Sequence, residues 1–176
     1  LGIGANTAIF TLVDQLVLRL LPVEDPRGLV WLRLEGVRPG GNWGDGTHTF
    51  PYPTYLALRD RNTVFSGLTG QRIELASLVD DERSAAVTVA MVAGNYFEVL
   101  GVRSELGRLL TPADDRDRNG HPVAVLQYDF WQSQYQGRPG VIGESIRVNG
   151  RPFTVVGVAA GGFEGTEVGG PTKLVG

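Results

Sequence analysis

Apolar and polar residues recur with helical periodicity over the first 22 residues of the chain. Projected at about 100° per residue, one side of this helix is a broad apolar arc made of Ile9, Phe10, Leu12, Val13, Leu16, Val17 and Leu20. The opposite side is largely polar, with Leu18 interrupting the row Thr7, Thr11, Asp14, Gln15 and Arg19. Pro22 ends the pattern, because proline lacks the N–H of a helical hydrogen bond and restricts the residue before it.

The polarity of this helix changes along its length. Residues 1–10 carry no charge and can lie in lipid, whereas Asp14 and Arg19 would each cost about 2.5–3.5 kcal/mol at a bilayer centre. We therefore expect residues 1–22 to be the outer end of a transmembrane helix that continues into water as a stalk. A soluble amphipathic helix docked on the domain's own core is the alternative. A signal peptide is disfavoured, because no basic segment precedes the apolar part and no small-residue cleavage site follows it.

Three elements are expected next. Alternating apolar residues predict a strand over residues 29–35. Residues 36–49 are rich in glycine and predict an exposed loop. Residues 52–61 predict a helix with proline in its first turn. One face of this helix, which we expect to pack on a sheet, carries Tyr52, Tyr55 and Leu58.

The sheet is expected to follow directly. Strands are predicted over residues 64–71, 74–79 and 83–91. The small and β-branched residues throughout 85–92 are typical of a strand that is buried on both faces. Gly94-Asn95 breaks this strand, and residues 96–100 predict a short helix that Gly101 ends.

The rest of the chain again alternates strands and helices. After an acidic loop, a strand is predicted over residues 122–126 and a helix over residues 129–136. Asn149-Gly150 lies between two alternating apolar runs within residues 145–157, which is the preferred sequence of a type I′ hairpin turn. Residues 161–176 hold glycine, proline and polar residues and predict no final element.

Together these elements predict an α+β fold. Its parts are a membrane-exit helix and stalk (residues 1–22), a first extracytoplasmic subdomain with a mixed β-sheet and packed helices (residues 23–105), and the start of a second α/β subdomain that ends in the hairpin (residues 106–176). With 176 residues, of which 42% are hydrophobic, the chain is long enough to bury a core in one or two such units.

Composition excludes several function classes. The net charge is −3, and the arginines are scattered among acidic residues without a basic stripe or an aromatic platform, so no nucleic-acid partner is predicted. The chain has no cysteine, which removes disulfides, thiolate nucleophiles and cysteine metal sites.

No arrangement of side chains predicts an active site. The two histidines, His48 and His121, lie far apart and outside any Ser-His-Asp order. Asp114, Asp115 and Asp117 share only their acidity with a calcium-binding loop, because the regular spacing and the downstream glutamate are missing. A solvated acidic loop is the simpler interpretation.

The remaining motifs have structural interpretations. The glycines of residues 36–46 lack the Gly-Lys-Ser/Thr ending of a phosphate-binding loop. Phe130, Trp131 and Tyr135 follow helical spacing and are typical of a packed core face. We therefore predict no catalytic, cofactor-binding or metal-binding residue, and no enzyme activity.

Phrases in a fixed order along the chain are more specific than any single residue. They are residues 2–10 (GIGANTAIF), 52–60 (YPTYLALRD), 65–68 (FSGL), 94–102 (GNYFEVLGV), 123–126 (VAVL), 141–143 (VIG), 149–150 (NG) and 153–158 (FTVVGV). With this ordered set the chain resembles the MacB-like periplasmic core domain of FtsX-type ABC-transporter permeases, in particular the duplicated orphan permeases. The resemblance extends to about residue 167.

The resemblance implies a non-catalytic extracytoplasmic domain inserted between the first two transmembrane helices of a permease in the bacterial inner membrane. Such a domain couples movements of the membrane helices to an external partner or cargo, in efflux or in lipoprotein or peptide export. The implied partners are the remaining membrane helices, a separate ATP-binding subunit and a second copy of the chain. No cofactor is implied, since the ATP is hydrolysed elsewhere.

Two features set this chain apart from the family pattern. The family's domain runs past this length, and its Asp-x-Trp-Val-Pro-like ending is missing after Gly169. The resemblance therefore implies an N-terminal fragment with an incomplete second subdomain. A free-standing soluble binding module or small enzyme, with the N-terminal helix in its own core, is the alternative function.

Overall fold

The computed structural model describes residues 23–32, 50–80, 83–116, 122–166 and 172–176. The helical elements are α2 (Tyr52–Asp60), α3 (Tyr96–Leu100), α4 (Tyr128–Tyr135) and the 3-10 turn η1 (Pro139–Val141). The strands are β1 (Gln71–Asp80), β2 (Arg83–Val92), β3 (Ser104–Gly107), β4 (Val123–Leu126), β5 (Ser145–Val148), β6 (Arg151–Ala159) and β7 (Leu174–Val175). None of the helices in these ranges has the length and apolarity that a membrane crossing requires. The predicted helix over residues 1–22 and the predicted loop over residues 36–49 lie outside the described residues.

The described strands form one mixed sheet in the order β3-β6-β4-β7-β2-β1-β5. β5 pairs with β6 as well as with β1, so the pairings from β6 round to β5 close into a ring, and β3 is attached to β6 outside it. This mixed sheet with its few helices confirms the α+β class. Strands from residues 23–105 and from residues 106–176 share the sheet, so the boundary predicted at residue 105 does not separate two sheets. The division into subdomains stays a prediction.

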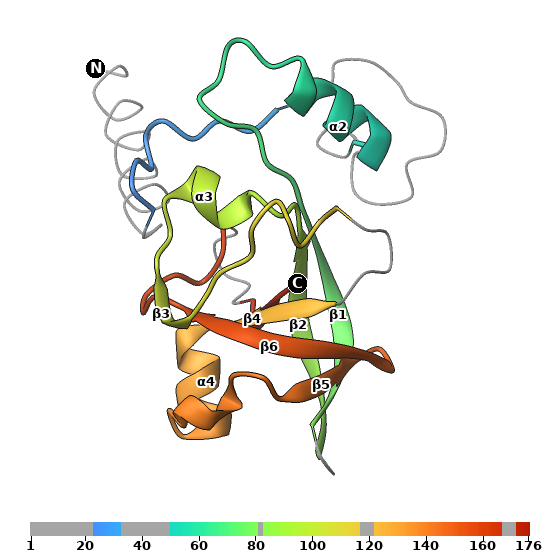
Figure 1. The fold of residues 1–176 in the computed structure, drawn as a ribbon, viewed down its shortest axis with the longest axis vertical. Coiled ribbons are helices and arrows are strands. Elements are labelled where there is room, and N and C mark those ends of the chain that lie inside the picture. The colour runs from blue at the N-terminus through green and yellow to red at the C-terminus, as the bar shows by residue number, and fades with distance from the viewer. Residues whose placement is uncertain (1–22, 33–49, 81–82, 117–121, 167–171) are drawn as a thin grey trace, which may run out of the picture.

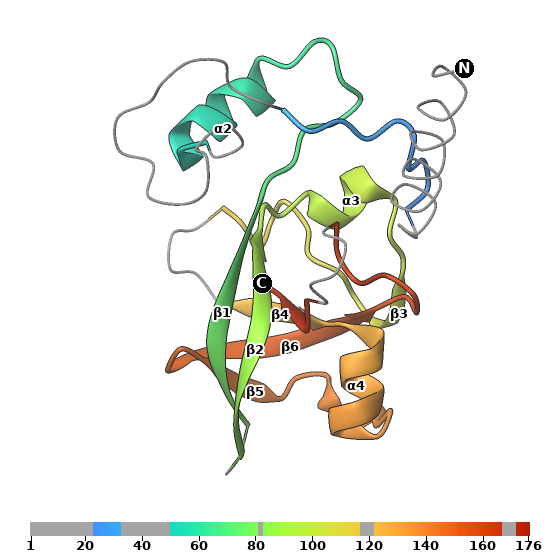
Figure 2. The ribbon, with the colours of Figure 1, turned by 180° about the vertical axis from the view of Figure 1, so that it is seen from behind.

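The sheet separates two apolar clusters. In both views α2 lies toward one end of the molecule and α4 toward the other (Figures 1 and 2). The first cluster joins the sheet to α4, and the second joins it to α3. Val89 and Ala90 are neighbours on β2 but belong to different clusters, because successive side chains of a strand point to opposite faces. The centre of β2 is therefore buried on both faces, as its composition predicted.

Several predicted elements are confirmed. Asn149 and Gly150 have φ angles of 50° and 79°, as a type I′ turn requires, and they join β5 to β6. Gly101 ends α3 with a φ of 66°, a left-handed conformation that costs glycine little. On α4, the aromatic side chains of the predicted core face are buried in the first cluster: Phe130, Trp131 and Tyr135.

Other predictions were wrong. Residues 29–32 are not a strand, although Leu29 packs against the second cluster; residues 33–35 lie outside the described residues. The strand predicted over 64–71 is absent except for Gln71, because residues 64–70 form bends and irregular structure. The strand predicted over 74–79 is part of a longer one, β1, because pairing with β2 continues without interruption from Gln71 to Asp80. Residues 161–176 do contain a final element: β7 fills the space between β2 and β4, where two residues complete the sheet.

Burial also departs from the predictions at two places. Ala85 and Ala86 are exposed, and among the described residues β7 pairs with β2 only at Val89 and Ala90, so no described strand lies beside the first half of β2 on that side. α2 buries Tyr55 alone, while Leu58 is 40% exposed. This helix lies at an end of the sheet rather than on one of its faces (Figure 1).

Candidate functional site

The chain is anchored to the sheet immediately after the predicted stalk. The N–H of Glu24 donates to the carbonyl of Leu100, the last residue of α3, at 3.2 Å. Val23 and Leu29 pack against the second apolar cluster on either side of this bond. Between them, the Asp25 carboxylate accepts the N–H groups of Arg27 and Gly28 at 3.2 Å, which orders the turn locally. Residues 23–29 therefore rest on α3 as a defined segment, which we call the entry segment.

Gly101 permits this close approach. A Cβ at Gly101 would overlap the Cβ of Glu24, so any larger residue would displace the entry segment. The same glycine has the positive φ that ends α3, and its N–H donates to the carbonyl of Glu98. The sequence pattern predicted the helix end but carried no signal for the contact with Glu24, which is remote along the chain.

Aromatic side chains fix α3 on the sheet. The rings of Tyr96 and Phe97 lie 5.4 Å apart in an edge-to-face arrangement, and Phe163 packs against both at 6.3 and 5.9 Å. All three side chains are at most 2% exposed. The hydroxyl of Tyr96 donates to the side-chain oxygen of Gln71, the first residue of β1, at 2.9 Å. This hydrogen bond connects α3 to the start of β1.

A polar network links α2 to the same region. The hydroxyl of Tyr55 donates to Asn95 at 3.3 Å, and the Asn95 amide donates to the carbonyl of Leu68 at 3.0 Å. The hydroxyl of Tyr52 donates to Asp115 at 3.1 Å. Burial and then the nearby Asp115 carboxylate raise the pKa of the Tyr52 phenol, so it stays a donor at neutral pH.

Gly94 is the crowded point of this network. Its N–H donates to the Asp115 carboxylate at 3.3 Å, and a Cβ there would lie 2.5 Å from the carbonyl oxygen of Thr111. The predicted break at Gly94-Asn95 is thus present, and its physical reason is the backbone of the 111–115 loop. The pairing of Tyr52 with Asp115 joins residues 63 positions apart, which no sequence pattern indicates.

The acidic loop is held by internal contacts. Both Asp114 oxygens accept from the Arg108 guanidinium at 2.8 Å, and the N–H and hydroxyl of Thr111 donate to the same carboxylate at 2.9 Å. Hydrogen bonds from Arg108 are the main reason that the pKa of Asp114 is lowered to about 2. Asp117 lies outside the described residues, as do His48 and His121. Within the described ranges no group of three or more His, Cys, Asp or Glu residues could hold a metal ion.

The Asp114 contacts predict an acid-sensitive stability. Because the folded-state pKa lies below the ordinary 3.8, the contribution of Asp114 is complete above about pH 5 and is lost as the pH falls toward 2. We expect it to be on the order of 1–2 kcal/mol, since Arg108 is half exposed and screened. Urea unfolding between pH 2.5 and 7 should show a smaller pH dependence for Asp114→Asn. Glu105→Gln, on exposed β3, is the control and should follow the wild type; equal slopes for wild type and Asp114→Asn would contradict the assignment.

One family of known proteins is similar to this chain over almost its whole length. The family model described as the MacB-like periplasmic core domain matches residues 1–174. A search of curated proteins found no match. Among solved structures, the chain is similar to the periplasmic region of MacB from Actinobacillus actinomycetemcomitans, with 22% identity and a TM-score of 0.57 over 70% of this chain and 52% of that one.

A second solved structure has the same fold. It is the extracellular domain of the noncanonic ABC-type transporter YknZ from Gram-positive bacteria, with 16% identity and a TM-score of 0.57 over 72% of this chain and 61% of that one. The alignments thus cover less than two thirds of either solved chain. At these identities the two structures establish the shared fold.

Proposed function

Because this chain belongs to the family of MacB-like periplasmic core domains, we propose that it is the extracytoplasmic domain of an ABC-transporter permease that transmits movement between membrane helices and an external partner. The proposed process is efflux or the export of a lipoprotein or peptide. The proposal assigns no catalytic step to this chain, since the ATP would be hydrolysed by a separate subunit. Its other partners are the remaining membrane helices and a second copy of the permease, in the inner membrane of a bacterium.

The observation that carries this proposal is the seating of the entry segment on α3. Residues 1–22 would be the membrane end and stalk, and residue 23 is the first residue of a segment packed on the second apolar cluster. The Glu24–Leu100 hydrogen bond, the aromatic contacts of α3 and the Tyr96–Gln71 hydrogen bond form a continuous connection from that segment to β1. A tilt of the stalk would therefore reorient the sheet as a body.

Membrane partition of the intact gene product tests the proposed location. We expect the product to remain with membranes after carbonate extraction. Carbonate does not extract a protein whose transmembrane helix buries about 20 apolar residues in the bilayer. The comparison is the 23–176 segment expressed alone in the same cells. Release of the intact product into the soluble fraction would overturn the proposal.

A glycine pair tests the proposed connection. Gly101→Ala and Gly150→Ala both place a side chain at a positive φ, with φ values of 66° and 79°, but only the Gly101 variant adds a clash, with Glu24. We expect a cost of about 1 kcal/mol for Gly150→Ala and about 1–3 kcal/mol more for Gly101→Ala. In hydrogen exchange, the Glu24 amide should exchange faster only in Gly101→Ala.

The same pair has a functional readout in the intact permease with its ATPase. Gly101→Ala should reduce transport per ATP hydrolysed, because a displaced entry segment no longer moves α3, whereas Gly150→Ala should leave that ratio unchanged. If Gly101→Ala exposes the Glu24 amide but transport per ATP stays at the Gly150→Ala level, the entry segment is not the connection.

A further inference from the structure

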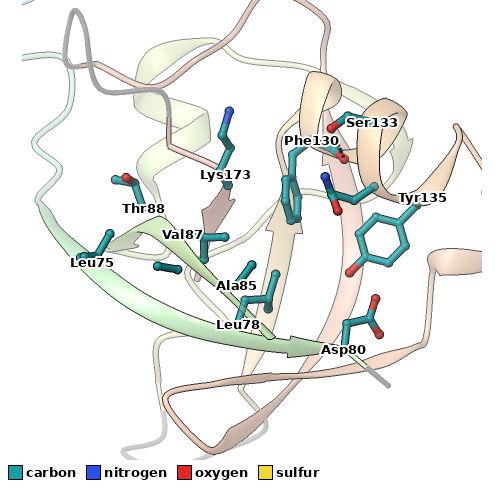
Figure 3. Close-up of a pocket in the computed structure, with 12 residues that line it drawn as sticks. Leu75, Leu78, Asp80, Ala85, Val87, Thr88, Phe130, Ser133, Tyr135 and Lys173 are labelled. Carbon is teal, nitrogen blue, oxygen red and sulfur yellow. Dashed lines mark hydrogen bonds between the residues drawn. The ribbon is translucent and has the colours of Figure 1, made fainter. Parts of the chain in front are cut away.

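An open groove lies at the end of the molecule away from α2. It has a volume of about 450 Å³, within the size range of ligand pockets, and runs between the β1–β2 hairpin and α4 (Figure 3). The hairpin contributes Leu78, Ala85 and Val87, and α4 contributes Phe130 and Ser133. None of these residues belongs to the contacts that hold the entry segment.

One wall of this groove is an edge of β2 that pairs with no strand in the described part of the chain. β2 pairs with β1 along its whole length, but on its other side β7 pairs only with Val89 and Ala90. On that side the carbonyls of Thr88 and Ala90 accept N–H groups from Lys173 and Gly176. Main-chain groups alternate in direction along a strand, so Ala86 and Ser84 point the same way as Thr88. Beyond Lys173, within the described residues, no strand pairs with these two residues.

The interior of the groove is apolar. The buried side chains of Leu78, Val87 and Phe130 form its floor, and Ala85 is exposed above them. This floor belongs to the face of β2 that packs in the first apolar cluster, and every second side chain of an adjoining strand would lie on the same face. An occupant that pairs with β2 would therefore place every second side chain on an apolar surface.

The two ends of the groove differ in charge. At one end the hydroxyl of Tyr135 points toward the Asp80 carboxylate, and together they close the groove (Figure 3). At the other end Lys173 stands at the rim beside Thr88, with its amine directed away from the floor (Figure 3). An acidic group on an occupant would be favoured near Lys173 and disfavoured near Asp80. The groove therefore favours one direction of a bound chain over the other.

We propose that this groove binds an extended segment of a partner polypeptide, which adds as a strand to the free edge of β2 at Ser84 and Ala86. Its main chain would pair with those two residues, its apolar side chains would contact the floor, and an acidic side chain would lie near Lys173. The spaced N–H and C=O groups of a strand edge match another main chain, which a lipid or a small apolar molecule does not provide. Four consecutive residues of β2, Ala85 to Thr88, line the groove, which corresponds to about 13 Å of strand and to roughly four residues of an occupant. This proposal does not depend on the membrane connection.

A phage-displayed library of random heptapeptides, selected on the 176-residue chain, is the probe. We expect enriched peptides to alternate apolar and polar residues and to carry an acidic residue toward one end. On binding a synthetic copy of an enriched peptide, the amides of Ser84 and Ala86 should become protected from hydrogen exchange. The amides of Ala85 and Val87 face β1 and should change little.

Two pairs of variants separate main-chain pairing from contact with the floor. Ala86→Pro removes the outward N–H at an edge position where proline is tolerated, and Ala86→Ser keeps it. Ala85→Arg fills the space over the floor, and Ala113→Arg makes the same change at an exposed loop position outside the groove. We expect Ala86→Pro and Ala85→Arg each to weaken peptide binding by about tenfold or more, and both controls to bind as the wild type does. Circular dichroism establishes that each variant is folded.

Four results would overturn the proposal. The first is a selection in which no peptide is enriched over an unrelated control protein. The second is peptide binding that Ala86→Pro does not weaken, which would indicate an apolar ligand site without strand addition. The third is displacement of the peptide by dodecyl maltoside at the same groove with no protection of the Ser84 and Ala86 amides. The fourth is protection of those amides in the intact gene product without peptide, which would show that its own chain fills the groove.

Discussion

Replacing Gly157 by alanine should destabilise the domain by about 3 kcal/mol or more, because the new methyl group has no space. Gly157 is buried in β6, where it pairs with Gly107 of β3 and with Val125 of β4. A Cβ there would overlap the carbonyl oxygen of Arg108. That oxygen belongs to the main chain, so a change of side-chain rotamer cannot relieve the overlap. β3 would have to separate from β6.

Urea unfolding followed by circular dichroism measures this cost. Gly161→Ala is the matched control, since the nearest atoms to its Cβ are ring carbons of Tyr128 at 3.6 Å, which is ordinary van der Waals contact. The control should change the free energy of unfolding by less than about 0.5 kcal/mol. If the two variants were equally stable, the close approach of β6 to the 107–108 turn would be wrong.

Truncation of Phe97 should cost about 3–5 kcal/mol, which is the range for removing a fully buried aromatic ring. Phe97 is 1% exposed and packs with Tyr96 and Phe163 between α3 and the sheet. Phe97→Ala would leave a cavity in the second cluster, against which Val23 and Leu29 of the entry segment pack. We therefore expect the Glu24 amide to exchange faster in this variant even under conditions in which most molecules remain folded.

Phe65 provides the control for Phe97. It lies on the connection from α2 to β1 and is 39% exposed, so Phe65→Ala should cost about 1 kcal/mol or less. Thermal unfolding of the two variants side by side gives the comparison. A cost for Phe65→Ala as large as that for Phe97→Ala would mean that the α2 region, rather than α3, holds this end of the domain together.

Phe97, Gly101 and Gly157 explain part of the ordered phrases in the sequence. Phe97 and Gly101 belong to the phrase over residues 94–102, and Gly157 belongs to the phrase over residues 153–158. In the structure they are sites where either a ring fills the core or a backbone passes too closely for any side chain. Such phrases describe the packing of the domain, and for that reason they identify its fold without indicating a reactive group.

Residues close together in the sequence were sufficient to predict the elements that depend only on their immediate neighbours. The Asn149-Gly150 turn, the end of α3 at Gly101 and the core face of α4 each depend on backbone preference or helical spacing, and each was predicted. The α+β class followed from the same elements. Alternation alone also predicted a strand over residues 29–35, but residues 29–32 pair with none of the described strands, and tertiary context overrides propensity.

Long-range pairing was decided only by the tertiary structure. β7 has two residues, too few for any periodic pattern, and it exists because β2 and β4 leave unpaired main-chain groups on either side of it. The contact of Glu24 with Gly101 likewise depends on which segments meet in space, as does the edge of β2 at Ala86, which pairs with none of the described strands on the β7 side. The sequence by itself thus determined the turns, the helix ends and the family of this protein, because these depend on neighbouring residues. The entry segment and the groove required the fold, because their parts are remote along the chain.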